Sequence, residues 1–325
     1  MRYFVQTTAS SPTLKSVMSR LVLSTVALLC TLSVVSATVG WDNCTNTFIN
    51  GYEPHSPSGA VKICRGGILA ISYDVDMIDP AFSGYYITPD DVKSVVPGRA
   101  NFYEDPDLKS LGITQAKVDS DAFNTSWNRG HLCPSHAMSH TSFSKHTTYT
   151  MANVAPQEGY FNQHPWQELE QSVFDWIKDH KALYIITGVA YKDRSKARRT
   201  FDNIAVPDYY FKVVCDKESQ QSVGVYGDNT EGNHGVSALE RVKYIEDEIY
   251  GGNLFPADAC RTDHLDHSHW WTHSSTVNLP PHRRAREEKL RRAFHDRAEK
   301  QLPKEPKAKM HARALGQMRE EKRAP

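Results

Sequence analysis

The stretch WNRGHLCPSH (residues 127–136) carries the residues from which the fold and the chemistry of this 325-residue chain can be argued. If residues 127–131 are extended, Arg129 and His131 face one side of the strand and Asn128 faces the other. An arginine and a histidine on one face can act on the same anion, because the arginine stabilises negative charge while the histidine accepts a proton. An Arg-x-His pair on a protein surface usually has no catalytic role, so further residues have to support this interpretation.

Runs of β-branched and aromatic residues predict strands on both sides of this stretch. GILAISYDV (67–75) and ALYIITGVAY (182–191) each predict a buried strand, while YYFKVVCD (209–216) and QSVGVYGD (221–228) predict a hairpin. GVSALERVKYIEDEIYG (235–251) predicts an amphipathic helix that ends near Gly251. The chain shows no internal repeat.

A further helix is predicted to begin near Pro165, since proline is favoured in the first helical turn. Its apolar residues fall on one stripe, which contains Trp166, Leu169, Val173, Trp176 and Ile177. Glu170 lies in the same stripe, about 40° from Trp166. A carboxylate on a buried stripe is costly unless it is paired, so Glu170 needs a cation, a metal-bound water or a hydrogen-bond donor. A structural pairing with a buried arginine is the alternative.

Asn162 is expected just before this helix, with its amide oxygen pointing away from the first turn. Hard cations such as Mg²⁺ accept neutral oxygen ligands and keep most of their waters, so a site with one protein ligand is chemically reasonable. A helix-capping or turn role is the ordinary alternative for such an asparagine.

Together these residues resemble a known family. Arg129-Gly130-His131, NVAPQ (153–157), Asn162, Trp166 and Leu169-Glu170 follow the order and spacing of the DNA/RNA non-specific endonucleases, which are sugar-non-specific and include endonuclease G. The resemblance extends more loosely from about residue 67 to 256, through GRANFYED (98–105), VPDYYFKVV (206–214) and VKYIEDEIYGGNLFP (242–256). It implies an α+β fold with a ββα-metal (His-Me finger) nuclease core, in which helices flank a central, mostly antiparallel sheet.

The resemblance also implies a Mg²⁺-dependent endonuclease that hydrolyses phosphodiester bonds of DNA and RNA, with Mn²⁺ as an alternative ion. It assigns these roles: His131 as general base, Asn162 as the direct metal ligand, Glu170 as the holder of metal-bound waters, Arg129 and Arg99 on the scissile phosphate, and Asn153 as a hydrogen-bonding support. Because the base must be neutral, activity is expected to fall below a pH near the ordinary histidine pKa of ~6.5.

The chain departs from the family at Asn128, where an aspartate is usual. The strand period places Asn128 on the face opposite His131, which predicts a supporting role that asparagine can partly fill. An inactive or weakly active relative that binds extracellular nucleic acid is the alternative. No stable membrane association is expected, and a homodimer stays open.

The N-terminus predicts export. Residues 1–20 carry basic but no acidic residues, the apolar run LVLSTVALLCTLSVV (21–35) follows, and small residues place cleavage after Ala37. Residues 1–37 are therefore read as a signal peptide and the product as secreted, with a mitochondrial presequence as the alternative. The sequons at Asn43 and Asn124 are compatible with a secreted glycoprotein.

Five cysteines follow the expected cleavage site, so at least one thiol lacks a partner within the chain. We expect the pairs Cys44–Cys64 and Cys215–Cys260, which leave Cys133 free. The sequence alone does not exclude other connectivities.

The predicted organisation is an endonuclease domain over 38–280 and a basic tail over 281–325. The tail holds 15 Lys and Arg against 7 Asp and Glu with few large apolar residues, which predicts a disordered segment or a solvated helix. The tail and the basic loop KDRSKARR (192–199) could contact phosphates, because the remaining domain is net acidic. The histidines and aspartates of DHLDHSHWWTH (263–273) could bind zinc, although a polar surface segment is the simpler interpretation.

Overall fold

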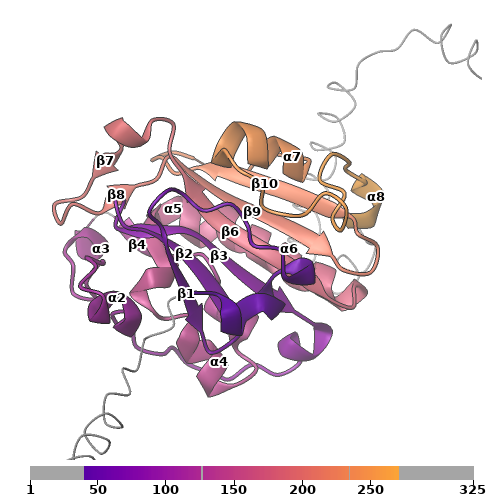
Figure 1. Cartoon of the computed structure of the whole chain (residues 1–325), viewed down its shortest axis with the longest axis horizontal. Helices are drawn as coiled ribbons and strands as arrows, with labels where there is room; N and C mark the ends of the chain where they lie inside the picture. Colours follow the sequence, from indigo (N-terminus) through magenta and orange to yellow (C-terminus); the bar gives the residue numbers. More distant parts are fainter. Residues whose placement is uncertain (1–39, 126, 234, 271–325) are drawn as a thin grey trace, which may run out of the picture. The chain divides into compact units, whose positions relative to one another are not determined.

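An antiparallel sheet forms the centre of the protein. The computed structural model describes residues 40–125, 127–233 and 235–270. Within this part the sheet has six strands in the order β1-β2-β3-β6-β9-β10, and every neighbouring pair is antiparallel (Figure 1). The strands are β1 (Val61–Arg65), β2 (Leu69–Asp74), β3 (Asp79–Ile87), β6 (Leu183–Ala190), β9 (Tyr209–Asp216) and β10 (Ser222–Asp228).

The predicted strands are confirmed. The four apolar runs contain β2, β6, β9 and β10, and the last two pair from Ser222↔Cys215 to Asp228↔Tyr209 as a hairpin. Successive side chains alternate between the two faces of the sheet. Ile185 therefore packs in one core cluster and Ile186 in another.

Helices cover both faces of the sheet, which gives the predicted α+β fold. The stripe of α6 (Gln167–Asp179) packs on the face that carries Ile185. The opposite face is covered by turns near Trp41 and by α7 (Val242–Tyr244) with the following π-helical segment Ile245–Tyr250. The other helices are α2 (Pro106–Ser110), α3 (Ala122–Thr125), α4 (Ser142–Thr147), α5 (Gly159–Phe161) and α8 (His267–Trp270).

The helix predicted over 235–251 is shorter than expected. Helical structure covers only 242–250, and Gly251 ends it with a φ of 84°, as the sequence indicated. Residues 237–240 instead lie along β10, where Ser237 N donates to Tyr226 O at 2.7 Å and Gly224 pairs with Glu240. This pairing gives hydrogen-bond partners to backbone N–H and C=O groups of the edge strand β10 that would otherwise be unpaired. These hydrogen bonds decide the conformation of 237–240 against the helix that the periodicity predicts.

The WNRGH stretch forms a second, smaller sheet. β4 (Trp127–His131) pairs antiparallel with β5 (Val154–Glu158), and the chain then enters α5 and α6. A strand, a strand and a helix thus follow one another as the ββα arrangement requires. A short pair, β7 (Arg198–Arg199) and β8 (Ala205–Val206), lies beside it (Figure 1).

Both predicted disulfides are confirmed. Cys44 is bonded to Cys64 and Cys215 to Cys260, while Cys133 is the free cysteine among the described residues. None of the helices in the described ranges combines the length and hydrophobicity of a membrane span. The predicted signal peptide and basic tail lie outside the described residues.

Candidate active site

β4 places Arg129 and His131 on one side of the small sheet, as the strand period predicts. Both contact the same ring: the Arg129 Cζ lies 5.5 Å and the His131 ring 5.1 Å from the centroid of Phe102. Gly130 between them is needed for close packing. A Cβ there would lie 2.6 Å from the Tyr210 hydroxyl, so any larger residue would push β4 away from the main sheet.

His131 lies in an apolar pocket with one nitrogen free of protein partners. Its ring contacts Phe102 and, at 5.2 Å, Tyr149. The Nε2 atom is buried and has no hydrogen-bond partner among the described residues. Burial lowers the pKa of His131 to about 4, and the positive charge of Arg99 contributes to the lowering. The imidazole is therefore neutral at physiological pH, and its free nitrogen can accept a proton.

Arg129 is held rigidly beside this histidine. Its Nη2 donates to Val118 O at 2.6 Å, and its guanidinium lies between the rings of Phe102 and Phe123. Its Nε is buried and has no partner in the described part of the chain. A fixed cation with a free N–H can bind an anion without first losing conformational freedom. Arg99 is exposed, yet close enough to His131 to affect its pKa.

Asn153 fixes the chain that follows β4. Its side-chain nitrogen donates to the carbonyls of Cys133 (3.0 Å) and Thr148 (2.9 Å). Its oxygen accepts from Cys133 N at 3.0 Å and from Ser83 Oγ at 2.7 Å. The fully buried amide thus has all its capacity used. It ties the chain at the end of β4 to Ser83 of β3.

Asn128 lies away from the candidate base. A Cβ on Gly159 would be 3.8 Å from the Asn128 side-chain oxygen, so this amide lies beside the first residue of α5. The backbone of Asn128 pairs with Gln157 on β5. The departure from aspartate therefore falls where β5 turns into the helix.

The helix that carries Asn162 begins earlier than predicted. The sequence placed its start near Pro165, but helical backbone begins at Gly159 and passes through a π-helical turn, Asn162–Trp166, before α6. Proline has no N–H to donate inside a regular α-helix, and the wider turn accommodates it. Asn162 is accordingly the half-buried first residue of the π turn rather than a residue ahead of the helix.

The predicted buried stripe of α6 is confirmed. All five apolar residues named from the periodicity are at most 7% exposed. Glu170 lies among them and lines a small cavity that is also lined by Lys212. Burial raises the pKa of Glu170, and the Lys212 ammonium opposes the rise. Glu170 is half-buried, and the cation that stabilises its carboxylate there is a lysine from β9.

Lys212 was not recognised from the sequence, although it interrupts the apolar run of β9. Its side chain is fully enclosed, donates to Thr187 Oγ1 and lies 5.4 Å from the centroid of Trp166. Burial lowers the pKa of Lys212, and Glu170 opposes the fall. A charge in the middle of a buried strand was the available signal, but its partner lies on a distant element.

Cys133, the free thiol, lies two residues beyond His131 and outside the strand. It is buried, and its backbone is held by Asn153. Burial raises the pKa of its thiol, so the reactive thiolate is suppressed.

The basic loop lies next to the site strand. Arg198 lies 5.5 Å from the ring centroid of Trp127 on β4 and donates to Asn229 O. Arg194 pairs with Asp74, and Lys196 with Asp193. Part of the loop charge is therefore neutralised, while Arg198 carries positive charge to the edge of the site.

Asn162 and Glu170 have the donor chemistry of a Mg²⁺ site. The first offers a partly exposed neutral amide oxygen, and the second a carboxylate two helical turns later. Oxygen ligands of this kind, few in number, suit an ion that retains most of its waters. The residues present therefore fit the metal that the resemblance implies.

Comparison with known proteins identifies the family of this chain. The sequence model of the DNA/RNA non-specific endonuclease family matches residues 55–247, which is more than half of the chain. The chain belongs to this family. Nuclease C1 of Cunninghamella echinulata var. echinulata is 28% identical over 156 residues, which cover 44% of this chain and 61% of that protein. Mitochondrial endonuclease G of Bos taurus is 25% identical over 123 residues, covering 35% and 40%.

A solved structure shares the fold. A chain in the crystal structure of an EndoG/EndoGI complex superposes with a TM-score of 0.55 at 19% identity, covering 67% of this chain and 94% of that one. This chain spans less than two thirds of the length of the curated relatives just named. The ββα nuclease fold predicted from the sequence is confirmed.

Proposed function

We propose that this protein is a divalent-metal-dependent endonuclease that hydrolyses phosphodiester bonds in DNA and RNA. The observation that carries the proposal is the His131 Nε2 atom, which is buried, has no hydrogen-bond partner in the described ranges and lies beside the fixed cation Arg129. A neutral imidazole next to a guanidinium is the combination that deprotonates a water while the anionic phosphate is held.

In this mechanism His131 accepts the proton of the attacking water. Its pKa of about 4 keeps the ring neutral, which a general base needs, but also limits its basicity. Arg129 stabilises the charge that develops on the phosphate oxygens, and Arg99 adds positive charge at the exposed side. Asn153 and Asn128 position β4 and its junction with β5 without touching the reacting atoms.

Asn162 would hold the metal ion, and Glu170 would hold waters around it. When bound, a Mg²⁺ ion polarises the phosphate and neutralises the leaving oxygen, and Mn²⁺ has the same ligand preferences. Burial raises the pKa of Glu170 to about 7, and the Lys212 ammonium limits this rise, so it favours the ionised carboxylate that the waters around the metal would need.

Two observations support a broad nucleic-acid substrate. The cations near His131 are arginines, which bind phosphate and carry no base specificity by that contact. Arg198 extends this charge along β4. A homodimer remains a prediction, to be checked by sedimentation.

We propose that the mature protein is secreted. Two disulfides are typical of an oxidising compartment, and Asn43 of the first sequon is exposed. The mitochondrial address of the endonuclease G relative keeps that alternative open. N-terminal sequencing of the mature protein separates them, since secretion predicts a start just after Ala37.

The test of function compares wild type with His131→Ala on plasmid DNA and on RNA, each with Mg²⁺ and with EDTA. We expect wild type to cleave both polymers with Mg²⁺ only, and the variant to lose activity by at least about 100-fold while its circular dichroism is unchanged. His264→Ala, an exposed histidine far along the chain, is the matched control. Undiminished cleavage by His131→Ala contradicts the proposal. If wild type instead slows the migration of nucleic acid in a gel without cutting it, the result supports the alternative, an inactive relative that binds nucleic acid.

A further inference from the structure

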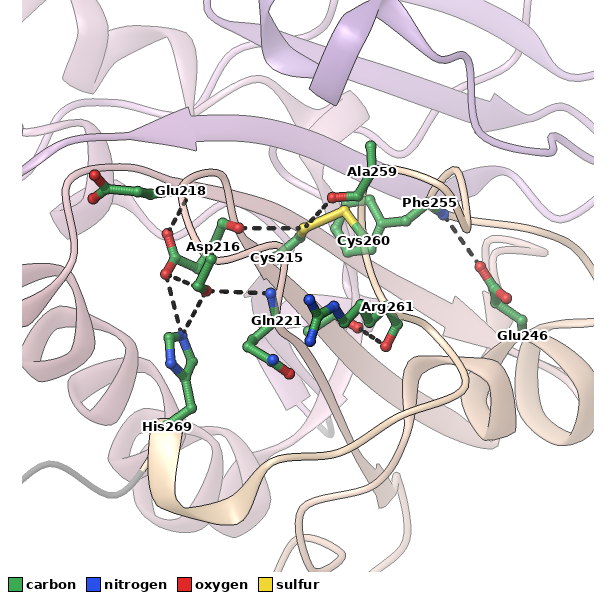
Figure 2. Close-up of a disulfide and its surroundings, with 12 residues drawn as sticks. Cys215, Asp216, Glu218, Gln221, Glu246, Phe255, Ala259, Cys260, Arg261 and His269 are labelled. Atoms are coloured by element: carbon green, nitrogen blue, oxygen red, sulfur yellow. Dashed lines mark hydrogen bonds and ion pairs between the residues drawn. A yellow bond between two sulfur atoms is a disulfide. The ribbon is translucent and has the colours of Figure 1, made fainter. Parts of the chain in front are cut away.

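Three side chains from three separate elements meet at the end of β9, beside the Cys215–Cys260 disulfide; Figure 2 shows the disulfide with two of them, Asp216 and His269. Asp216 is the last residue of β9, His180 follows α6, and His269 lies in α8. The Asp216 Oδ2 lies 3.2 Å from His180 Nδ1 and 3.2 Å from His269 Nε2. Figure 2 shows His269 reaching from α8 toward the Asp216 carboxylate.

The cluster is enclosed by the protein. The side chains of His180, Asp216 and His269 are 7%, 4% and 19% exposed. The two imidazoles are 4.7 Å apart between centroids, and Trp270 lies against both rings. The surrounding protein therefore keeps most water away from the carboxylate and the two imidazoles.

The carboxylate is also held in its ionised form. Although burial raises the pKa of Asp216, hydrogen bonds from His180, Ser219 and the backbone of Glu218 lower it below its ordinary value. Ser219 Oγ donates to Asp216 Oδ2 at 2.6 Å and lies 3.0 Å from His269 Nε2. Metal binding requires a deprotonated carboxylate and neutral imidazoles, and the carboxylate meets this condition at neutral pH.

We propose that His180 Nδ1, Asp216 Oδ2 and His269 Nε2 bind a Zn²⁺ ion, separately from the candidate active site. Zinc–nitrogen and zinc–oxygen bonds of 2.0–2.1 Å at tetrahedral angles separate neighbouring ligand atoms by about 3.3 Å. The two spacings of 3.2 Å match that edge, and all three atoms lie within 4.8 Å of one another. Two imidazoles and one carboxylate favour zinc over magnesium, which prefers oxygen ligands alone.

The ion would fasten the chain that follows β10 to the sheet. The disulfide fixes Cys260 to β9, and the zinc ligand His269, nine residues later, would fix α8 to the same strand. Trp270 is fully buried and packs against Trp176 of α6 at 5.2 Å. Tryptophan emission should therefore change when the site fills.

The test uses the untagged full chain with its disulfides intact, stripped with EDTA and dialysed into Mg²⁺. We expect one Zn²⁺ per chain by isothermal titration, a rise in melting temperature and a change in tryptophan emission. Co²⁺ in place of Zn²⁺ should give the visible absorption bands of a tetrahedral site, which a hexa-coordinate ion at Asn162 would not produce.

His269→Asn should lower the zinc affinity at least 100-fold, remove the melting-temperature rise and abolish the cobalt bands. His267→Asn, an exposed histidine in the same helix, is the matched control and should bind as wild type does. Zinc binding that is unchanged in His269→Asn overturns the proposal. The absence of tight zinc and cobalt binding by wild type also overturns it and leaves a hydrogen-bonded cluster only. Neither result depends on nuclease activity.

Discussion

The burial of His131 predicts that acid destabilises wild type more than a His131→Gln variant. In an unfolded chain the imidazole has its ordinary pKa of ~6.5, whereas burial lowers the pKa of His131 in the folded protein to about 4. Between these values the unfolded chain binds a proton that the folded chain does not. Stability therefore falls as the pH falls.

The magnitude follows from this difference. From about pH 7 to about pH 5 the unfolded histidine becomes protonated while His131 stays neutral, which costs wild type about 2 kcal/mol of unfolding free energy. The figure is an upper value, since the residue is half-buried and solvent screens part of the effect. The variant lacks this titration. Between the two pH values its free energy of unfolding should therefore fall by about 2 kcal/mol less than that of wild type.

Urea unfolding followed by tryptophan fluorescence measures the difference, with both proteins at both pH values. His264→Gln removes an exposed histidine and should lose as much stability as wild type does. Equal acid losses in wild type and His131→Gln would show that His131 titrates normally and would refute the reasoning. The result also bears on activity: the limit near pH 6.5 expected from the sequence is wrong for this histidine if its pKa is about 4.

Three further predictions concern other residues of the candidate site. Lys212→Met should raise the pKa of Glu170 further and move the acidic limb of plasmid cleavage upward by about one pH unit, seen in initial rates across pH. Asn128→Asp should change the cleavage rate less than about threefold in the same assay, because its side chain lies beside Gly159. The Cys133 thiol should react with a thiol reagent at least about 100-fold more slowly in the native protein than in urea, because it is buried and its pKa is raised.

Features that depend on local periodicity could be predicted from the sequence. The two-residue period of a strand placed Arg129 and His131 together against Phe102, and the helical period placed the α6 stripe in the core. Both periods are fixed by backbone geometry within a few residues, so distant parts of the chain do not alter them. The cysteine pairs were also expected correctly, although spacing alone left other connectivities open.

Features that depend on competition between elements could not be predicted in this way. Residues 237–240 pair with β10 because an open strand edge lies beside them, and nothing within the segment shows that edge. Pro165 suggested a helix start, but the helical backbone that reaches it from Gly159 accommodates it in a wider turn. His269 was noted among its sequence neighbours, whereas its partners His180 and Asp216 lie on other elements.

Glu170 depends both on local periodicity, which could be predicted, and on packing between elements, which could not. The helical period placed its carboxylate on a buried face, and the cost of burying a charge required a partner there. That argument specifies the sign of the partner but not its position, because the α6 stripe packs on the central sheet through contacts that no periodicity encodes. The partner is Lys212, an ammonium on β9 that lines the same cavity. Because each charge shifts the pKa of the other, removing the lysine changes the ionisation of the glutamate without touching the proposed metal ligand Asn162. Lys212→Met therefore separates the electrostatic support of the proposed metal site from its ligation.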